Sequence, residues 1–274
     1  MSFEHEVREG VLKVEGVNLE LGGRPILRDV HAEIKNIHRP GIAQGQVVGL
    51  LGPSGMGKTQ LFRILAGLNQ PDSGTVKVTE KGIEVKAGMV GVVAQQYPLF
   101  RHRTVLGNLV VAGRQAGHSA EESTTKGKEL LARFDLAEHG DKYPAQLSGG
   151  MRQRVAIAQQ FMCSDYFLLM DEPFSGLDPL ALDEMCNFIC EMARTDELKT
   201  FIVVTHDIEA AITVCDTLWL LGRERDAEGK PIPGAMVKHN IDLIARGLAW
   251  RADIRELPQF QLLVNEIRDL FRTL

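Results

Sequence analysis

The residues whose types and spacing best suit chemistry form one glycine-rich stretch, Gly52-Pro53-Ser54-Gly55-Met56-Gly57-Lys58-Thr59. The stretch fits G-x-x-x-x-G-K-S/T, a loop that surrounds phosphate groups. Its glycines let backbone N–H groups approach an anion closely. Lys58 is expected to reach the outer phosphates, and the Thr59 hydroxyl to ligate magnesium. The pattern predicts a site for a nucleoside triphosphate such as ATP with magnesium (Mg2+). The alternative is a glycine-rich turn that matches by chance.

Two adjacent carboxylates form the second candidate group. Asp171 and Glu172 directly follow an apolar run, residues 166–170. Asp171, at the end of a buried strand, would hold the magnesium directly or through water. Glu172 can polarise a water molecule for in-line attack on a terminal phosphate. The alternative is a solvated acidic pair before Pro173, and the apolar run disfavours it.

A second glycine-rich stretch, Leu147-Ser148-Gly149-Gly150-Met151, precedes these carboxylates in the chain. Ser148 is a good helix N-cap, and the helix is expected to run through Met162. A helix start of this kind offers a second place for an anion. By itself, Ser-Gly-Gly is a common loop, and one nucleotide does not need two phosphate sites in one chain.

A strand and a helix must flank the first glycine-rich stretch if it is to bind phosphate. The apolar run at 46–51 predicts a buried strand, and residues 61–68 carry apolar side chains at helical spacing. Residues 11–34 alternate around Gly22-Gly23, which predicts two antiparallel strands joined by a turn. Further strands are expected at 75–78, as an edge strand, and at 89–93, 166–170, 201–204 and 217–221, the last of the chain.

The remaining segments are expected to be helices and loops. Thr104 is expected to cap a helix, a second helix follows at 120–134, and with the helix after Ser148 they form an all-helical insert at about 97–160. Residues 35–41 predict a loop, and 36–43 look like an insertion without an assigned purpose. Residues 222–234 predict a linker or hairpin loop. An amphipathic helix is expected near the C-terminus, packed on its own domain rather than on a membrane.

Composition restricts the class of protein. The chain has 274 residues, 44% hydrophobic and 24% charged, and a formal net charge of −5. This balance is ordinary for a soluble globular protein, and the acidic net charge leads us to expect no nucleic acid as partner. Four cysteines without a C-x-x-C pair suggest neither a metal site nor a disulfide framework. No run is long enough to span a membrane, and the acidic start is not that of a secretory signal.

The stretch Leu147-Ser148-Gly149-Gly150-Met151 resembles the signature of the ATP-binding cassette (ABC) transporter ATPases, which runs Leu-Ser-Gly-Gly and then usually Gln or Met. The resemblance covers about residues 11–222. It implies a head-to-tail dimer, a homodimer or a pseudo-dimer with a second nucleotide-binding subunit. Each ATP would then lie between the P-loop of one subunit and the signature of the other.

The same resemblance assigns roles to further residues. Gln95 matches the glutamine of the Q-loop, with Gln96 as its neighbour in the alternative register, and is implied to contact magnesium and water. Asp178 resembles the D-loop aspartate, which crosses to the partner subunit. His206 resembles the switch histidine, which contacts the γ-phosphate and positions Glu172. Two positions depart from the family pattern: Leu21 replaces the usual aromatic residue beside adenine, and Gln60 replaces the usual threonine after Thr59.

These observations lead to one favoured interpretation. The fold class is α/β, a P-loop NTPase core with a mixed sheet, an antiparallel N-terminal β subdomain and an all-helical insert. Residues 1–229 would form the nucleotide-binding domain, and 230–274 a C-terminal helical tail of unknown role. The resemblance implies an ATP-hydrolysing, energy-coupling subunit of a membrane transporter.

Segment 97–109 and Tyr143–Leu147 resemble bacterial import systems, which favours import of a small polar solute. The subunit would lie in the cytoplasm, on the cytoplasmic face of the inner membrane, and bind an integral permease through the groove beside the Q-loop. The alternatives are a lipid or export system and a soluble family member acting on ribosomes or DNA.

Overall fold

The computed structural model describes residues 5–38, 45–78, 82–163, 167–195 and 200–274. Its centre is a six-stranded sheet in the order β10-β9-β3-β8-β7-β6. The strands are β3 (Gln46–Leu51), β6 (Gly91–Val93), β7 (Phe167–Asp171), β8 (Thr200–Thr205), β9 (Thr217–Gly222) and β10 (Met236–Asp242). All neighbours run parallel except β10, which is antiparallel to β9. The sheet is therefore mixed, as the sequence predicted.

The central strands are largely apolar, in keeping with a sheet that is covered on both faces. Alternate residues of β3 contribute to different cores: Val48 and Leu50 face one side, Val47 and Leu51 the other. The first core packs under a four-stranded antiparallel sheet and α1 (Lys58–Leu65), and the second under the helices. Burial on both faces removes the polar alternation that marks a half-exposed strand.

The antiparallel sheet has the order β2-β1-β4-β5. Its strands are β1 (Glu6–Leu21), β2 (Arg24–His38), β4 (Ser73–Val78) and β5 (Ile83–Glu84). Gly22 and Gly23, both with positive φ, form the predicted turn between β1 and β2. This sheet is the expected N-terminal β subdomain.

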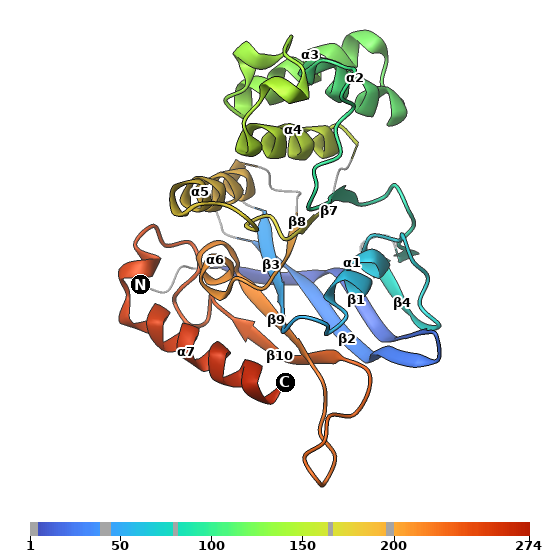
Figure 1. The fold of residues 1–274 in the computed structure, drawn as a ribbon, viewed down its shortest axis with the longest axis vertical. Helices are drawn as coiled ribbons and strands as arrows, with labels where there is room; N and C mark the ends of the chain where they lie inside the picture. Colours follow the sequence, from blue (N-terminus) through green and yellow to red (C-terminus); the bar gives the residue numbers. More distant parts are fainter. Residues whose placement is uncertain (1–4, 39–44, 79–81, 164–166, 196–199) are drawn as a thin grey trace.

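Three helices form a separate lobe beyond the β6 edge of the sheet, at the top of Figure 1. They are α2 (Val105–Gln115), α3 (Ala120–Arg133) and α4 (Gly149–Phe161). Each begins at a predicted or typical cap, with Thr104, Ser119 and Ser148 accepting a hydrogen bond from a backbone N–H of the first turn. The lobe matches the expected all-helical insert.

The other helices cover the second face of the main sheet: α5 (Pro179–Thr195), α6 (Ile208–Val214) and α7 (Pro258–Thr273). The amphipathic helix near the C-terminus is confirmed as α7. Its buried residues are Phe260, Leu263, Val264 and Ile267, so it packs on its own chain as expected. None of the described helices is both long and apolar enough to cross a membrane.

Four expectations about elements were wrong. Residues 35–38 continue β2 rather than forming a loop, and the last pair of the ladder is Glu6↔His38. The remainder of the expected insertion, 39–43, lies outside the described residues. The strand at 75–78 is internal, because the short β5 pairs with β4 at the edge. The strand at 217–221 is not the last, because 223–235 form a hairpin loop, and β10 pairs back onto β9. The tail from residue 230 is therefore not purely helical.

Candidate functional site

The first glycine-rich stretch lies at the carboxyl end of β3, between the strand and α1. A Cβ at Gly52 would lie 2.6 Å from the carbonyl oxygen of Leu221 on β9. Gly57 has φ 84°, and a Cβ there would lie 2.9 Å from Ile26. Both glycines are thus required by close approach, and Gly55 also has positive φ. No side chain caps α1, and no acidic residue lies in its first turn. The N–H groups at the helix start are therefore suited to an anion.

Lys58 points back across this loop. Its Nζ donates hydrogen bonds to the carbonyl oxygens of Gly52, at 2.6 Å, and of Pro53, at 3.3 Å. Burial lowers the pKa of Lys58, against the raising influence of the nearby Glu172 and Asp171 carboxylates. The hydrogen bonds to Gly52 and Pro53 hold the Lys58 amino group within the loop, close to both acidic residues.

The two carboxylates lie at the carboxyl end of β7 and differ in environment. Burial raises the pKa of Asp171; Glu172 adds to this and Lys58 opposes it. Glu172 has φ 50°, a left-handed conformation that costs a non-glycine residue about 1–3 kcal/mol. Its backbone N–H donates to the carbonyl of Val204 on β8, at 2.8 Å. This hydrogen bond to β8 therefore helps to hold the Glu172 backbone in its unusual conformation.

The Glu172 side chain is directed toward the tip of β8. Its Oε2 lies 2.9 Å from His206 Nδ1 and accepts from the Thr205 hydroxyl at 3.2 Å. The Glu172 side chain is only 17% exposed, whereas that of His206 is 63% exposed. A largely buried carboxylate is thus oriented by a solvent-facing imidazole, an arrangement suited to polarising water.

Gln95 follows β6, the edge strand beside β7, and reaches the same region. Its Nε2 donates to the Ser175 hydroxyl, at 3.3 Å, in the loop that follows Glu172. Asp178 lies at the start of α5, where its Oδ1 accepts from the N–H groups of Leu180 and Ala181 at 3.0 and 3.1 Å. The Asp178 carboxylate therefore stabilises the start of α5 in this chain.

The second glycine-rich stretch lies apart from the P-loop, at the start of α4 in the helical lobe (Figure 1). Its hydrogen bonds are local: Ser148 Oγ accepts from Met151 N at 3.3 Å, and Leu147 O accepts from Arg152 at 2.7 Å. Gly149 and Gly150 begin the helix, with no acidic residue in its first turn. The partial positive charge at this helix N-terminus suits an anion. The P-loop of the same chain lies elsewhere, so the two stretches do not form one site within this chain.

The two departures from the family pattern are also placed. Leu21 ends β1 at the hairpin turn and is 45% exposed. The Gln60 side chain accepts a hydrogen bond from Asn69 at 3.1 Å, at the far end of α1. Gln60 therefore serves the packing of α1, and Leu21 leaves an apolar surface accessible to a base.

The residues present fit ATP and magnesium. Gly52 and Gly57 keep the P-loop free of side-chain bulk, and Lys58 provides a cation. Thr59, Gln95 and Asp171 offer a hydroxyl, an amide and a carboxylate, the oxygen ligands that magnesium prefers.

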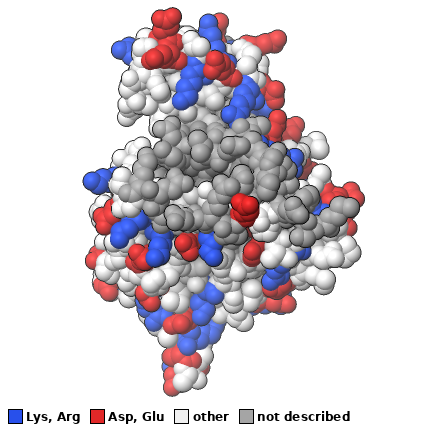
Figure 2. Space-filling model, turned by 180° about the vertical axis from the view of Figure 1, so that it is seen from behind, with Lys and Arg blue, Asp and Glu red and all other residues white. Residues whose placement is uncertain are grey.

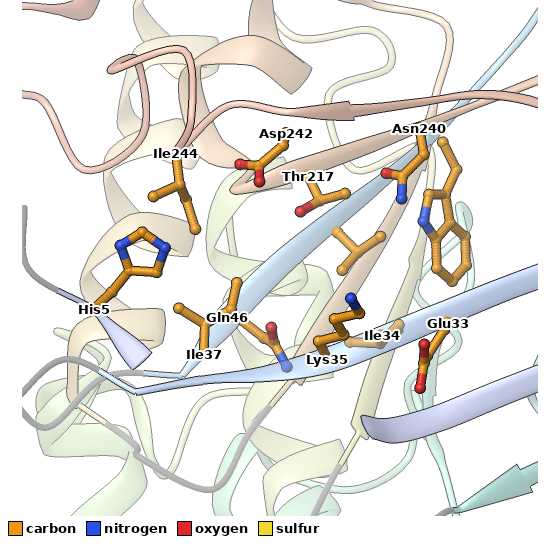
Figure 3. A pocket seen from close by; sticks show the side chains of 12 residues that line it. His5, Glu33, Ile34, Lys35, Ile37, Gln46, Thr217, Asn240, Asp242 and Ile244 are labelled. Carbon is orange, nitrogen blue, oxygen red and sulfur yellow. The ribbon is translucent and has the colours of Figure 1, made fainter. Parts of the chain in front are cut away.

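A cavity lies between β2, β9 and β10, near the start of β3. It has a volume of about 380 Å³, and Trp219 is among the residues that line it. Figure 3 shows four further lining residues, Glu33 and Lys35 of β2 and Asn240 and Asp242 of β10. Gln46 and Thr217 in its lining start β3 and β9, whereas the P-loop follows the end of β3. This cavity is therefore remote from the residues predicted to act on a nucleotide.

Thr205 and Ser175 lie in the stretches that resemble the switch-histidine segment and the D-loop, but the sequence did not predict their contacts with Glu172 and Gln95. The position of Thr205 could have indicated a role at the site, because Thr205 directly precedes His206 at the end of an apolar strand. The contact of Ser175 with Gln95 could not be predicted, because it depends on how β6 and β7 are paired.

The fold and this site define a P-loop protein with a signature-bearing helical lobe. A family model described as ABC transporter matches residues 37–175. The sulfate/thiosulfate import ATP-binding protein CysA of Pectobacterium atrosepticum is 36% identical over 219 residues, 77% of this chain and 64% of that protein. The L-cystine transport system ATP-binding protein TcyN of Escherichia coli is 35% identical over 231 residues, 79% of this chain and 88% of that protein.

Among solved structures, cbiO1 of Clostridium perfringens, described as part of the ABC transporter complex cbiONQ, matches with a TM-score of 0.73 at 25% identity. The match covers 94% of this chain and 100% of that one. The chain spans less than two thirds of the length of the CysA proteins it matches. It belongs to the ABC transporter family.

Proposed function

We propose that this chain is the ATP-hydrolysing, energy-coupling subunit of a membrane ABC transporter, a bacterial importer of a small polar solute. The names of the similar import ATP-binding proteins support the transport role. The observation that carries hydrolysis is the largely buried Glu172 carboxylate, oriented by His206 and Thr205 and near the P-loop lysine.

Each residue has a defined task in this proposal. The P-loop amides and Lys58 bind the phosphates, and Lys58 exchanges its bonds to Gly52 and Pro53 for phosphate oxygens. Thr59, Asp171 and Gln95 would hold magnesium, which neutralises phosphate charge when bound. Glu172 accepts a proton from the attacking water, while His206 keeps its carboxylate oriented.

We further propose that two such subunits complete the site. The signature residues Leu147–Met151 of one subunit would then face the P-loop of the other, and Asp178 would lie at their interface. A permease would bind beside Gln95, with the subunit on the cytoplasmic face of the inner membrane. Acidic and basic side chains are interspersed on the described part of the face in Figure 2, which supports a protein partner over nucleic acid.

Replacing Glu172 with glutamine tests the proposal. Glu172→Gln keeps the side-chain volume and removes the proton acceptor. We expect ATP hydrolysis to fall about 10²–10⁴-fold with ATP affinity retained. The matched control is Glu184→Gln, an exposed substitution on α5 that should leave turnover unchanged. Near-normal turnover of Glu172→Gln would remove Glu172 as the base.

A further inference from the structure

Helix α4 carries two glutamines on one face, Gln153 and Gln160, two helical turns apart. The Gln153 side chain is fully buried, with 0% exposure. Buried amides are costly unless they form hydrogen bonds. Both glutamines form one outside the helical lobe: Gln153 with the loop that follows β7, and Gln160 with strand β6.

Gln153 bonds to the catalytic loop. Its Nε2 donates to the carbonyl oxygen of Pro173 at 2.8 Å. Pro173 directly follows Glu172, the residue held at positive φ. The bond therefore fixes the backbone immediately after the proposed catalytic carboxylate, from the helix that begins at the signature.

Gln160 bonds to the strand that leads into the Q-loop. Its Oε1 accepts from the backbone N–H of Val92 at 3.1 Å. Val92 lies in β6, the edge strand of the main sheet, whose only strand partner in the described chain is β7. The glutamine thus satisfies a donor that an edge strand would leave to water, and links α4 to the segment before Gln95.

Only the NH2 group of the Gln153 amide forms a hydrogen bond within the described structure. Its Oε1 is buried and has no hydrogen-bond partner among the described residues. An apolar side chain of equal size would avoid this desolvation cost. Retaining an amide here favours a role for the directional bond to Pro173 over simple filling of space.

We propose that Gln153 and Gln160 are positioning residues that fix the signature helix to the Glu172 loop and to the Q-loop strand, so that the orientations of Ser148 and Glu172 change together. This inference rests on the proposed function and assigns it a mechanical link within one chain. Neither glutamine touches the P-loop through the bonds described, so nucleotide affinity should not depend on them.

The first test is Gln153→Met, which keeps the volume and removes the donor. We expect turnover to fall about tenfold with KM unchanged, the effect of losing one bond that orients a reacting group. The matched control is Gln159→Met, on the same helix but partly exposed. Equal turnover in the two variants would overturn the proposal for Gln153.

A conservative variant separates positioning from packing. In Gln153→Glu, the protonated carboxyl can donate to Pro173, whereas the carboxylate cannot. The ratio of variant to wild-type turnover should therefore rise as the pH falls through the pKa of the introduced carboxyl. A ratio independent of pH from 5 to 8 would contradict the role of the donor.

A measurement without hydrolysis keeps this inference distinct from the proposed function. In the nucleotide-free protein, Gln153→Met should speed amide exchange at 172–176, and Gln160→Met should speed it at Val92. Gln159→Met should do neither. If the wild type proves inactive, the proposed function fails, while unchanged exchange in both variants overturns the link itself. Gln153→Glu and Gln160→Met continue the test if Gln153→Met does not fold.

Discussion

Asp171, the proposed magnesium ligand, lies in a site that disfavours its own charge. Burial and Glu172 raise the pKa of its carboxyl. A carboxyl whose pKa is higher in the native state than in the unfolded state binds its proton more tightly in the native state. Its contribution to stability is therefore lost as the pH rises through the native pKa.

We expect Asp171→Asn to stabilise the metal-free protein at neutral pH by about 1 kcal/mol, because it removes this penalty. The gain should disappear as the pH falls below the unfolded pKa, where Asp171 is protonated in both states. MgATP should stabilise the wild type more than the variant. Thermal unfolding at pH 3 and pH 7, with and without MgATP, measures both effects. Destabilisation of the metal-free variant at pH 7 would contradict the argument.

Leu21 leads to a prediction about base selectivity. An aromatic side chain adds about 1–3 kcal/mol of stacking per base, while leucine offers mainly apolar contact. Leu21 is exposed at the β1–β2 turn, so an added ring has room. Leu21→Tyr should increase the preference for ATP over GTP in competition binding. Equal selectivity of the two proteins would show that the base lies elsewhere.

At the residue scale, the sequence indicated the groups whose roles depend on local order. The P-loop and Asp171-Glu172 follow apolar strands, and those strands formed where expected. The contacts of Thr205 and Ser175 could not be predicted, because they join the ends of different strands and loops. The same holds for Gln153 and Gln160, which look like ordinary polar positions of a helix.

At the element scale, the strands buried on both faces could be predicted from the sequence. The central strands carry continuous apolar residues, since both faces are covered. Strand β10 was missed because it lies at the edge, and its sequence Met-Val-Lys-His-Asn-Ile-Asp is largely polar. The end of β2 was missed for a similar reason, since Lys35 and Asn36 pair with β1 by backbone bonds.

Two arginines of the C-terminal segment form contacts with α5 and α6, the helices next to the site. Arg255 donates to Asp183 of α5 and, at 3.2 Å, to the Thr213 hydroxyl of α6. Arg268 of α7 pairs with Glu209 of α6 at 3.0 Å. Helix α6 begins two residues after His206, so these contacts hold in place the helix that follows this histidine.

We expect Arg255→Met to lower the free energy of unfolding by about 0.5–1 kcal/mol, the range for a partly exposed ion pair. It should also speed amide exchange in α6. The control is Arg251→Met, because Arg251 pairs with Asp253 two residues away. Denaturant unfolding and amide exchange measure the two effects. The same loss in both variants would exclude a specific role of the Arg255 contacts.

At the scale of the whole molecule, the P-loop and the signature in one chain are two halves of different proposed sites. Ser148→Arg adds bulk and charge at the start of α4, apart from the P-loop of its own chain. We expect hydrolysis to be lost with nucleotide binding by the monomer nearly intact. Fluorescent-nucleotide titration and turnover assays separate these effects.

Sedimentation provides the companion measurement. Glu172→Gln should form dimers with ATP, and the double variant with Ser148→Arg should stay monomeric. If Ser148→Arg abolished nucleotide binding by the monomer, the shared-site arrangement would be wrong.

The order of strands in the main sheet also bears on which bond of a nucleotide the proposed site would cleave. Strand β8 lies between β3, which leads to the P-loop, and β7, which leads to Glu172. Neighbouring strands lie about 4.8 Å apart, so two intervals separate the ends of β3 and β7 by about 10 Å. In the proposed function, the Glu172 carboxylate thus starts from a strand end about two strands away from the end that leads into the P-loop, and we expect it to act on the terminal rather than the innermost phosphate. This spacing favours release of the terminal phosphate over nucleotidyl transfer at the innermost one.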